Sequence, residues 1–246
     1  WLALAVVSCS PKSADQETVS SRPANTSADA NVENQKFITA NPFNLSQISA
    51  ISKFRSCVGH DYSGLNANGK EETKRSMKHY LNGIDLVAGS DDKVKVYAPF
   101  DGTITFIDDD FASFEGRQRG QQIWLSSEST DDWVFVFFHV ILLESIKKDT
   151  EVRSGQHIGY ADLENSPNFD ITLKKSGFLG PSTIESPFLY MNTEVIEQYT
   201  DKGLKLDEFI ISKSERNTFP CVCSGEYCSF PSNSPENNPE DWVIVG

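Results

Sequence analysis

The chain reads Val94-Lys95-Val96-Tyr97-Ala98, then Pro99-Phe100-Asp101-Gly102, then Thr103-Ile104-Thr105-Phe106-Ile107. In the first and third pieces the side chains alternate in polarity and several are β-branched, which is typical of strands with one buried face. The middle piece contains Pro, Asp and Gly, which favour a turn. This stretch therefore predicts two strands with a turn between them.

Further strands are predicted on the C-terminal side of this stretch. Residues 122–125 form one short apolar segment. Residues 133–143 are apolar on both faces, which predicts a central strand that is covered on both sides. Turn signals follow at residues 153–155 and 165–167, and helical periodicity is weak until a short helix predicted over residues 193–200. Short strands at this spacing predict an all-β core.

The composition excludes several classes of protein. The 246 residues carry 22 Lys and Arg against 35 Asp and Glu, a formal net charge of -13, and 38% of them are hydrophobic. The apolar content is enough for a core, so a wholly disordered chain is excluded. Nucleic acid and anionic membrane surfaces are excluded as partners, because both require clustered Lys and Arg. The longest apolar run, residues 134–143, is shorter than the roughly 18 residues of a transmembrane helix.

The first nine residues resemble the end of a lipoprotein signal peptide. They are apolar and lack both Met and a basic segment, so we expect a signal peptide that is truncated at its start. Val6-Val7-Ser8-Cys9 has the order of a bacterial lipobox, in which the Cys becomes the lipid-modified N-terminus. The alternative is a chance Cys after a secretory segment. Ser10 resembles signals that sort to an outer membrane, so we expect an exported lipoprotein anchored there and facing the periplasm.

The remaining chain divides by composition. Residues 10–45 are mostly small and polar, and such a stretch cannot bury enough apolar surface to order itself. We therefore predict a flexible tether over residues 10–45 and a β domain over residues 46–175. Residues 176–246 are predicted to form a C-terminal extension with a short helix and a cluster of cysteines.

Four motifs follow one another in an order known from one family. They are Gly83-Ile84-Asp85-Leu86-Val87-Ala88, Val96-Tyr97-Ala98-Pro99-Phe100-Asp101-Gly102-Thr103-Ile104, Phe138-His139-Val140 and Val152-Arg153-Ser154-Gly155-Gln156-His157-Ile158-Gly159. Their order and spacing resemble the lysostaphin-type (LytM-like) zinc endopeptidases of bacterial cell walls, over roughly residues 54 to 173. The resemblance implies a compact antiparallel β fold (the duplicated hybrid motif) with a groove over the central sheet.

The resemblance also implies a zinc site, from which this sequence departs. In that family zinc is held by the His and Asp of an H-x-x-x-D motif and by the second His of an H-x-H motif, and a His on a neighbouring strand assists the attacking water. Asp85 matches the ligand Asp, and His139 matches the strand His. Leu81 stands in place of the first His, and Asn168-Phe169-Asp170 stands in place of H-x-H.

Two interpretations of this site stay open. A two-residue insertion would restore His79 as a ligand, so that His79, Asp85 and Asp170 bind zinc while His139 and His60 are catalytic. The protein would then be an active zinc endopeptidase that cleaves peptidoglycan cross-links. The interpretation that we favour is a catalytically impaired domain without zinc, which binds peptidoglycan or regulates a separate cell-wall hydrolase through the groove.

Simpler interpretations are kept beside these two. His139 on an apolar strand fits a core His that is hydrogen-bonded to the backbone. Asp85 fits a residue that caps a turn, and His79 beside Lys78 fits a surface position. The whole chain would then be an exported β domain with an unrelated binding role.

The other four cysteines predict two disulfides, because exported proteins meet an oxidising environment. A bond between Cys221 and Cys223 would close a very tight ring. We therefore expect Cys57 to pair with one of these two and Cys228 with the other. The long bond would staple the C-terminal extension across the domain. A small metal site is the rival interpretation, but the sequence lacks the two C-x-x-C pairs of a zinc ribbon.

Overall fold

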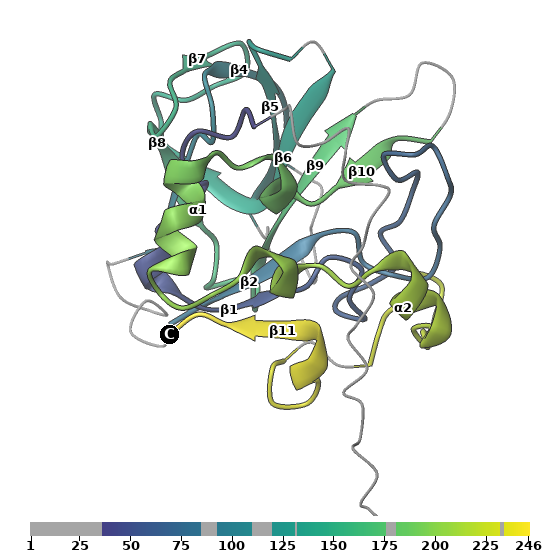
Figure 1. Cartoon of the computed structure of the whole chain (residues 1–246). Coiled ribbons are helices and arrows are strands. Elements are labelled where there is room, and N and C mark those ends of the chain that lie inside the picture. Colours follow the sequence, from purple (N-terminus) through teal and green to yellow (C-terminus); the bar gives the residue numbers. More distant parts are fainter. Residues whose placement is uncertain (1–35, 85–92, 110–119, 131, 176–180, 232–233) are drawn as a thin grey trace, which may run out of the picture.

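The computed structural model describes residues 36–84, 93–109, 120–130, 132–175, 181–231 and 234–246, and Figure 1 shows the whole chain. The predicted signal peptide, Cys9 and Asp85 lie outside the described residues, as does the predicted tether up to residue 35. Among the helices that the structure describes, none is long and apolar enough to cross a membrane.

The described residues form one antiparallel sheet. Its strands are β1 (Ile48–Ser52), β2 (His79–Gly83), β3 (Lys95–Tyr97), β4 (Gly102–Asp108), β5 (Gln121–Ser127), β6 (Trp133–Leu142), β7 (Glu151–Val152), β8 (His157–Ala161), β9 (Phe169–Lys175), β10 (Thr183–Glu185) and β11 (Trp242–Ile244). The strand order is β11-β1-β2-β9-β6-β5-β4-β7. β10 pairs with β9, and β8 pairs with both β3 and β6. The prediction of an all-β core is confirmed.

Helical segments are few and short in the described part of the chain. The α-helices are α1 (Thr193–Thr200), which matches the predicted helix, and α2 (Lys213–Thr218). The 3-10 helices are η2 (Leu45–Gln47), η3 (Pro187–Tyr190), η4 (Leu206–Phe209) and η5 (Pro239–Asp241). Asn192 caps α1 by accepting a hydrogen bond from the Val195 N–H, and Val195 and Tyr199 bury the inner face of that helix.

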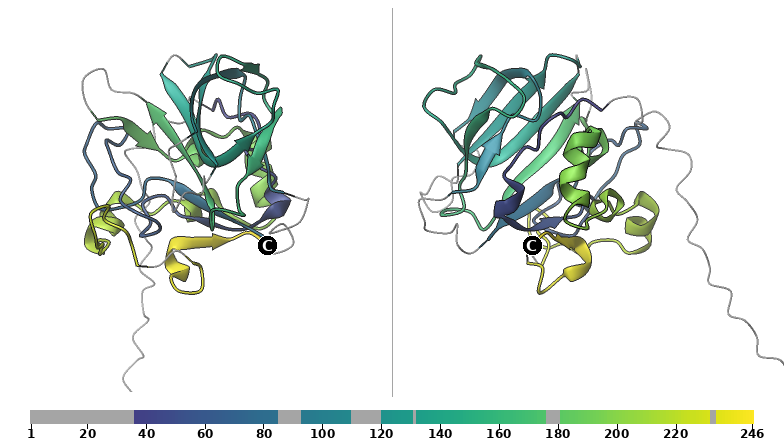
Figure 2. Two further views of the ribbon diagram at one scale, coloured as in Figure 1. Left: turned by 180° about the vertical axis from the view of Figure 1, so that it is seen from behind. Right: turned by 60° about the vertical axis from the view of Figure 1, so that its left-hand side comes forward.

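The stretch that begins at Val94 forms a corner of the sheet. β3 and β4 lie on either side of residues 98–101, yet β3 pairs with β8 while β4 pairs with β5 and β7. A Cβ on Gly102 would lie 2.2 Å from the carbonyl oxygen of Ser126, so only Gly permits this close approach of two backbones. The two views in Figure 2 show the strands curling strongly at this end of the molecule.

β6 is the central strand, as its apolar sequence predicts. It lies between β5 and β9 and also pairs with β8 at its C-terminal end. Phe135 and Phe137 are fully buried in the main core and contact each other with ring centroids 4.6 Å apart. Large buried side chains such as these supply most of the apolar area that stabilises the fold.

Residues 36–45 belong to the folded domain, so the prediction of a tether is wrong for this part. Phe37, Ile38 and Phe43 are buried in the main core. Ile38 forms an isolated bridge with Met191, and Phe43 forms one with Val96. With Leu45, four large apolar side chains in ten residues bury enough surface to order this segment, although the polar residues around them dilute the signal in the sequence.

The described part of the C-terminal extension completes the sheet instead of following it. β10 extends the sheet beside β9, and β11 pairs with β1, so that the first and last strands are neighbours. Phe188 and Phe209 stack with ring centroids 4.3 Å apart inside the main core. Removing residues 176–246 would therefore expose the core of the β domain.

Two disulfides join Cys57 to Cys221 and Cys223 to Cys228, which is one of the two pairings that the sequence left open. The first bond connects residues that are 164 positions apart. Arg216 lies beside it, donating to the Cys57 sulfur at 2.8 Å and to the Asp241 carboxylate at 2.5 Å. The Cys57 N–H donates to the same carboxylate. The Cys57–Cys221 disulfide and the Arg216–Asp241 ion pair together hold the C-terminal extension against the domain.

Candidate functional site

The candidate site lies on one face of the sheet, where β2, β9 and β6 run side by side. Asp170 of β9 pairs with Tyr80 of β2 and with Phe138 of β6. Directly paired residues project from the same face of a sheet, and residues two apart along a strand do so as well. Lys78, Tyr80, Phe138 and Asp170 therefore share this face.

The centre of the face is a buried ion pair. The Lys78 ammonium lies 2.8 Å from Asp170 Oδ2, and only 4% of the Lys78 side chain and 1% of the Asp170 side chain are exposed. The ammonium also lies 4.0 Å from the ring centre of Phe138, 4.4 Å from that of Tyr62 and 5.6 Å from that of Tyr80. The carboxylate and the three aromatic faces all stabilise the positive charge.

His139 reaches this pair because β6 bulges at its position. Between the pairs Gln121–Val140 and Ile123–Phe137, β5 advances by two residues and β6 by three. The extra residue re-aims a side chain, as bulges commonly do. His139 has a φ of 61°, unusual for a residue other than Gly, and its Nε2 lies 3.9 Å from Asp170 Oδ1. The sequence predicts His139 as a site residue, and the structure places it beside Asp170.

His60 stands at the edge of the same face. It lies in the loop between β1 and β2, with its ring centroid 6.4 Å from that of Tyr62 and its Nδ1 3.1 Å from the Asp61 carbonyl oxygen. Burial and the positive charge of Lys78 lower the pKa of His60, although Asp61 and Asp170 oppose this shift. His60 is therefore a neutral imidazole at neutral pH.

Asp61 fixes the loop that carries His60 and Tyr62. Its carboxylate accepts hydrogen bonds from the backbone N–H groups of Lys74 and Arg75 and from the Ser63 hydroxyl. The Met77 N–H then donates to the Tyr62 carbonyl oxygen at 2.9 Å. These bonds hold Tyr62 edge-on to Phe138, with ring centroids 5.7 Å apart.

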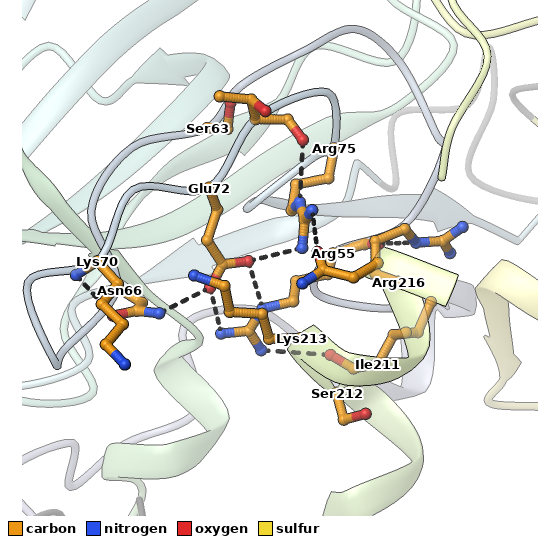
Figure 3. A network of polar contacts seen from close by, with 12 residues as sticks. Arg55, Ser63, Asn66, Lys70, Glu72, Arg75, Ile211, Ser212, Lys213 and Arg216 are labelled. Carbon is orange, nitrogen blue, oxygen red and sulfur yellow. Dashed lines mark hydrogen bonds and ion pairs between the residues drawn. The ribbon is translucent and has the colours of Figure 1, made fainter. Parts of the chain in front are cut away.

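A buried polar network fastens the other half of this loop (Figure 3). The Glu72 carboxylate accepts from Arg55 Nε at 2.8 Å and Nη2 at 3.0 Å, from Arg75 Nη1 at 2.9 Å and from Asn66 Nδ2 at 3.0 Å. Arg55 also donates to the Ile211 carbonyl oxygen, so the network reaches the C-terminal extension. The loop that places His60 and Tyr62 at the edge of the site is therefore held firmly against the rest of the domain.

His79 lies on the opposite face of the sheet. It pairs with Ile171, one position away from the Tyr80–Asp170 pair, and is fully buried. Its Nδ1 lies 2.7 Å from the Ser52 carbonyl oxygen and its Nε2 lies 2.8 Å from the Ser186 hydroxyl. Burial lowers the pKa of His79 to about 4. The expected grouping of His79 with Asp170 is therefore corrected. Side chains alternate along β2, so Tyr80 shares a face with its partner Asp170 while His79 projects from the opposite face.

The residues of this face that the structure describes do not fit a zinc ion. Structural and catalytic zinc sites use three or four His, Cys or carboxylate ligands. Within the described ranges, no group of three such residues could hold a metal ion. One Asp170 oxygen is already paired with Lys78. The third predicted ligand, Asp85, lies outside the described residues.

Sequence reasoning missed Lys78 and Tyr62. A weak signal for Lys78 is present in Met77-Lys78-His79-Tyr80-Leu81, where the apolar Met77 and Leu81 would fall on one face of a strand together with His79. Reading this period of two would have placed Lys78 and Tyr80 on one face and His79 with the core residues. Tyr62 carries no comparable signal, because its place depends on a loop.

Comparisons with known proteins give remote structural similarities. No family model matches the chain, and no curated protein matches it. A structure of the SpoIIQ–SpoIIIAH pore-forming complex has a TM-score of 0.39 and 14% identity, covering 67% of this chain and 98% of that one. The catalytic domain of the prophage-encoded M23 protein EnpA from Enterococcus faecalis has a TM-score of 0.33 and 13% identity, covering 55% and 94%. Lysostaphin has a TM-score of 0.31 and 18% identity, covering 56% and 54%.

Lysostaphin and an M23 protein are thus among the solved structures that this chain is similar to. At these identities and TM-scores the likeness does not extend to a shared activity.

Proposed function

We propose that this protein is an exported, lipid-anchored domain of the lysostaphin type that binds peptidoglycan and does not cleave it. The observation that carries the proposal is the buried Lys78–Asp170 pair in the middle of the candidate site. A metallopeptidase needs that position for a metal ligand, whereas a binding face does not. The choice of peptidoglycan as the ligand rests on the family that the sequence motifs resemble.

The arrangement around the pair suits binding of a polar polymer. His60 lies beside Tyr62 and His139 beside Asp170, both are partly exposed, and an imidazole ring can take part in hydrogen bonds through either nitrogen. Aromatic faces and hydrogen-bonding groups together recognise sugar rings and peptide amides. The hydrogen bonds of Asp61 and Glu72 hold the loop that carries His60 and Tyr62, which lowers the entropic cost of binding.

Anchoring and export form the second part of the proposal. Cys9 would carry the lipid, and the chain between it and residue 36 would link the anchor to the domain. The two disulfides support export, because such bonds persist in oxidising compartments. Held in the periplasm in this way, the domain would meet the cell wall, either alone or together with a hydrolase whose activity it regulates.

Co-sedimentation with purified peptidoglycan tests the binding. We expect the protein to sediment with the insoluble polymer and to release no soluble muropeptides, as measured by chromatography of the supernatant. His139→Asn should reduce binding at least several-fold, because Asn tolerates the positive φ at this position while losing the imidazole. His157→Asn is the matched control, because it makes the same substitution at a histidine of β8 whose ring contacts Tyr97 and Tyr160, which are not residues of the candidate site. Equal binding by both variants contradicts the proposed face, and no sedimentation points to an unrelated binding role.

The alternative is an active zinc endopeptidase, and one observation favours it. Asp170 Oδ1 is buried without a hydrogen-bond partner, so one carboxylate oxygen retains free lone pairs next to His139. In that case Asp170 and Asp85, which lies outside the described residues, would be two of the ligands, and His139 and His60 would assist catalysis. Muropeptides that appear with the wild-type protein and zinc, and disappear in His139→Asn, would establish this alternative.

A further inference from the structure

We infer that the Lys78 ammonium is the cation of this site. It pairs with Asp170 in the place where a metal ion would otherwise bind. This inference deepens the proposed function, because it names the group that keeps the face free of zinc. It stands on the position of Lys78, its carboxylate partner and the three rings around it.

The position of Lys78 is set by the strand that it precedes. It lies one residue before β2 and projects from the same face as Tyr80, whose backbone pairs with Asp170. From there the ammonium reaches Asp170 Oδ2 at 2.8 Å. Lys is almost never fully buried unless it is paired, so a Lys with 4% of its side chain exposed marks a site that is built around its charge.

The aromatic rings make the site specific for a cation. Phe138, Tyr62 and Tyr80 come from three separate segments of the chain, and the Lys78 ammonium lies within 5.6 Å of all three ring centres. Ring faces carry negative electrostatic potential, which attracts a positive charge in a desolvated place. The face therefore supplies one carboxylate and three aromatic rings to a single positive charge.

A metal ion and this ammonium exclude each other. Zinc binds carboxylate oxygens at about 2.0–2.2 Å, so an ion on Asp170 would lie only a few ångströms from the Lys78 nitrogen. Like charges at such a distance repel strongly in a buried site, where water screens them poorly. The ammonium would have to leave its carboxylate and its rings before zinc could bind.

A double-mutant cycle with a zinc measurement tests the inference in the intact chain. The variants are Lys78→Met, Asp170→Leu and the double variant. Lys174→Met is the control, because the Lys174 ammonium lies 4.6 Å from the Trp124 ring centre and is also partly buried. Thermal unfolding gives Tm. Each protein is also incubated with zinc chloride and desalted, and its zinc content is measured by elemental analysis.

We expect each single variant at the pair to lose roughly 10 °C in Tm, because it leaves one buried charge uncompensated. The double variant should recover most of this loss, and Lys174→Met should change Tm by only about 2 °C. The wild-type protein should retain far less than one zinc ion per chain.

Three results would overturn the inference. They are losses that add up in the double variant, a Lys78→Met variant no less stable than Lys174→Met, and stoichiometric zinc in the wild type that disappears in Asp170→Leu. If Lys78→Met does not fold, the double variant and the zinc content of the wild type still decide. Peptidoglycan binding is a separate measurement, so its failure would contradict the proposed function and leave the coupling of Lys78 to Asp170 intact.

Discussion

Replacing Glu72 by Gln should destabilise the protein by about 3–5 kcal/mol at pH 7. The Glu72 carboxylate is fully buried and accepts four hydrogen bonds, three of them from Arg55 and Arg75. The side chains of these two arginines are only 12% and 7% exposed. Gln keeps the shape but removes the charge, so two buried guanidinium groups lose their anion. Breaking a buried pair by removing one partner costs about 3–5 kcal/mol, a large share of a typical total stability of about 5–15 kcal/mol.

The pH dependence of this loss follows from the pKa of Glu72. Burial alone would raise that pKa, but the hydrogen bonds and charge of Arg55, with help from Asn66 and Arg75, outweigh it and hold the pKa below its ordinary value of 4.5. A carboxyl group with a depressed pKa contributes stability above its unfolded pKa and loses it as the pH falls through the folded pKa. The difference between wild type and Glu72→Gln should therefore be complete at pH 7 and shrink below about pH 4.5.

Urea unfolding followed by tryptophan fluorescence measures both effects. Glu71→Gln is the matched control, because Glu71 is the preceding residue and is exposed. Its free energy of unfolding should stay within about 0.5 kcal/mol of the wild type. If Glu72→Gln costs no more than Glu71→Gln, or if its cost is the same at pH 7 and pH 3, then the network does not stabilise the loop that carries His60.

Three further predictions concern other parts of the fold. Replacing Cys57 and Cys221 by Ala should lower the unfolding free energy by about 5 kcal/mol, and replacing Cys223 and Cys228 by Ala should lower it by about 2 kcal/mol. The difference arises because loop-closure entropy grows with the separation of the bonded residues, which is 164 in the first pair and 5 in the second. Equal losses in urea unfolding would contradict this. Gly120→Ala should lower Tm more than Gly203→Ala, because both have a positive φ but only the Cβ on residue 120 meets the His139 backbone, at 2.7 Å; matching Tm values would refute the clash. Burial lowers the pKa of His79 to about 4, so the unfolded chain binds the extra proton and stability should fall by about 3 kcal/mol from pH 7 to pH 4. That slope should vanish in His79→Gln, and an unchanged slope would assign it to another group.

The strands were predictable because their local pattern agrees with their burial. The alternation around the Pro99–Gly102 turn and the apolar run of β6 each point to one structure only. The segment 36–45 was misjudged, because its few large apolar residues show no regular period and gain their burial from residues far along the chain, as Ile38 does from Met191 and Phe43 from Val96.

The site was only partly predictable for a different reason. Matching residues by their spacing in a motif grouped His79, His139 and Asp170. The structure brings His139 and Asp170 together, but a strand alternates its faces, which separates His79 from Asp170. The bulge that re-aims His139 has no signature in the sequence. Glu72 was missed as well, since its partner Arg55 is 17 residues away and only the folded loop brings them together.

The bond between Cys57 and Cys221 turns most of the domain into a covalent ring. Both ends of the chain lie outside the ring, and there β1 and β11 pair with each other. A protease that cuts once inside the ring opens it without releasing a fragment, because the two pieces remain joined through sulfur. The ring therefore gives the domain tolerance to a single cut, and such a nicked chain would separate into two pieces only after reduction.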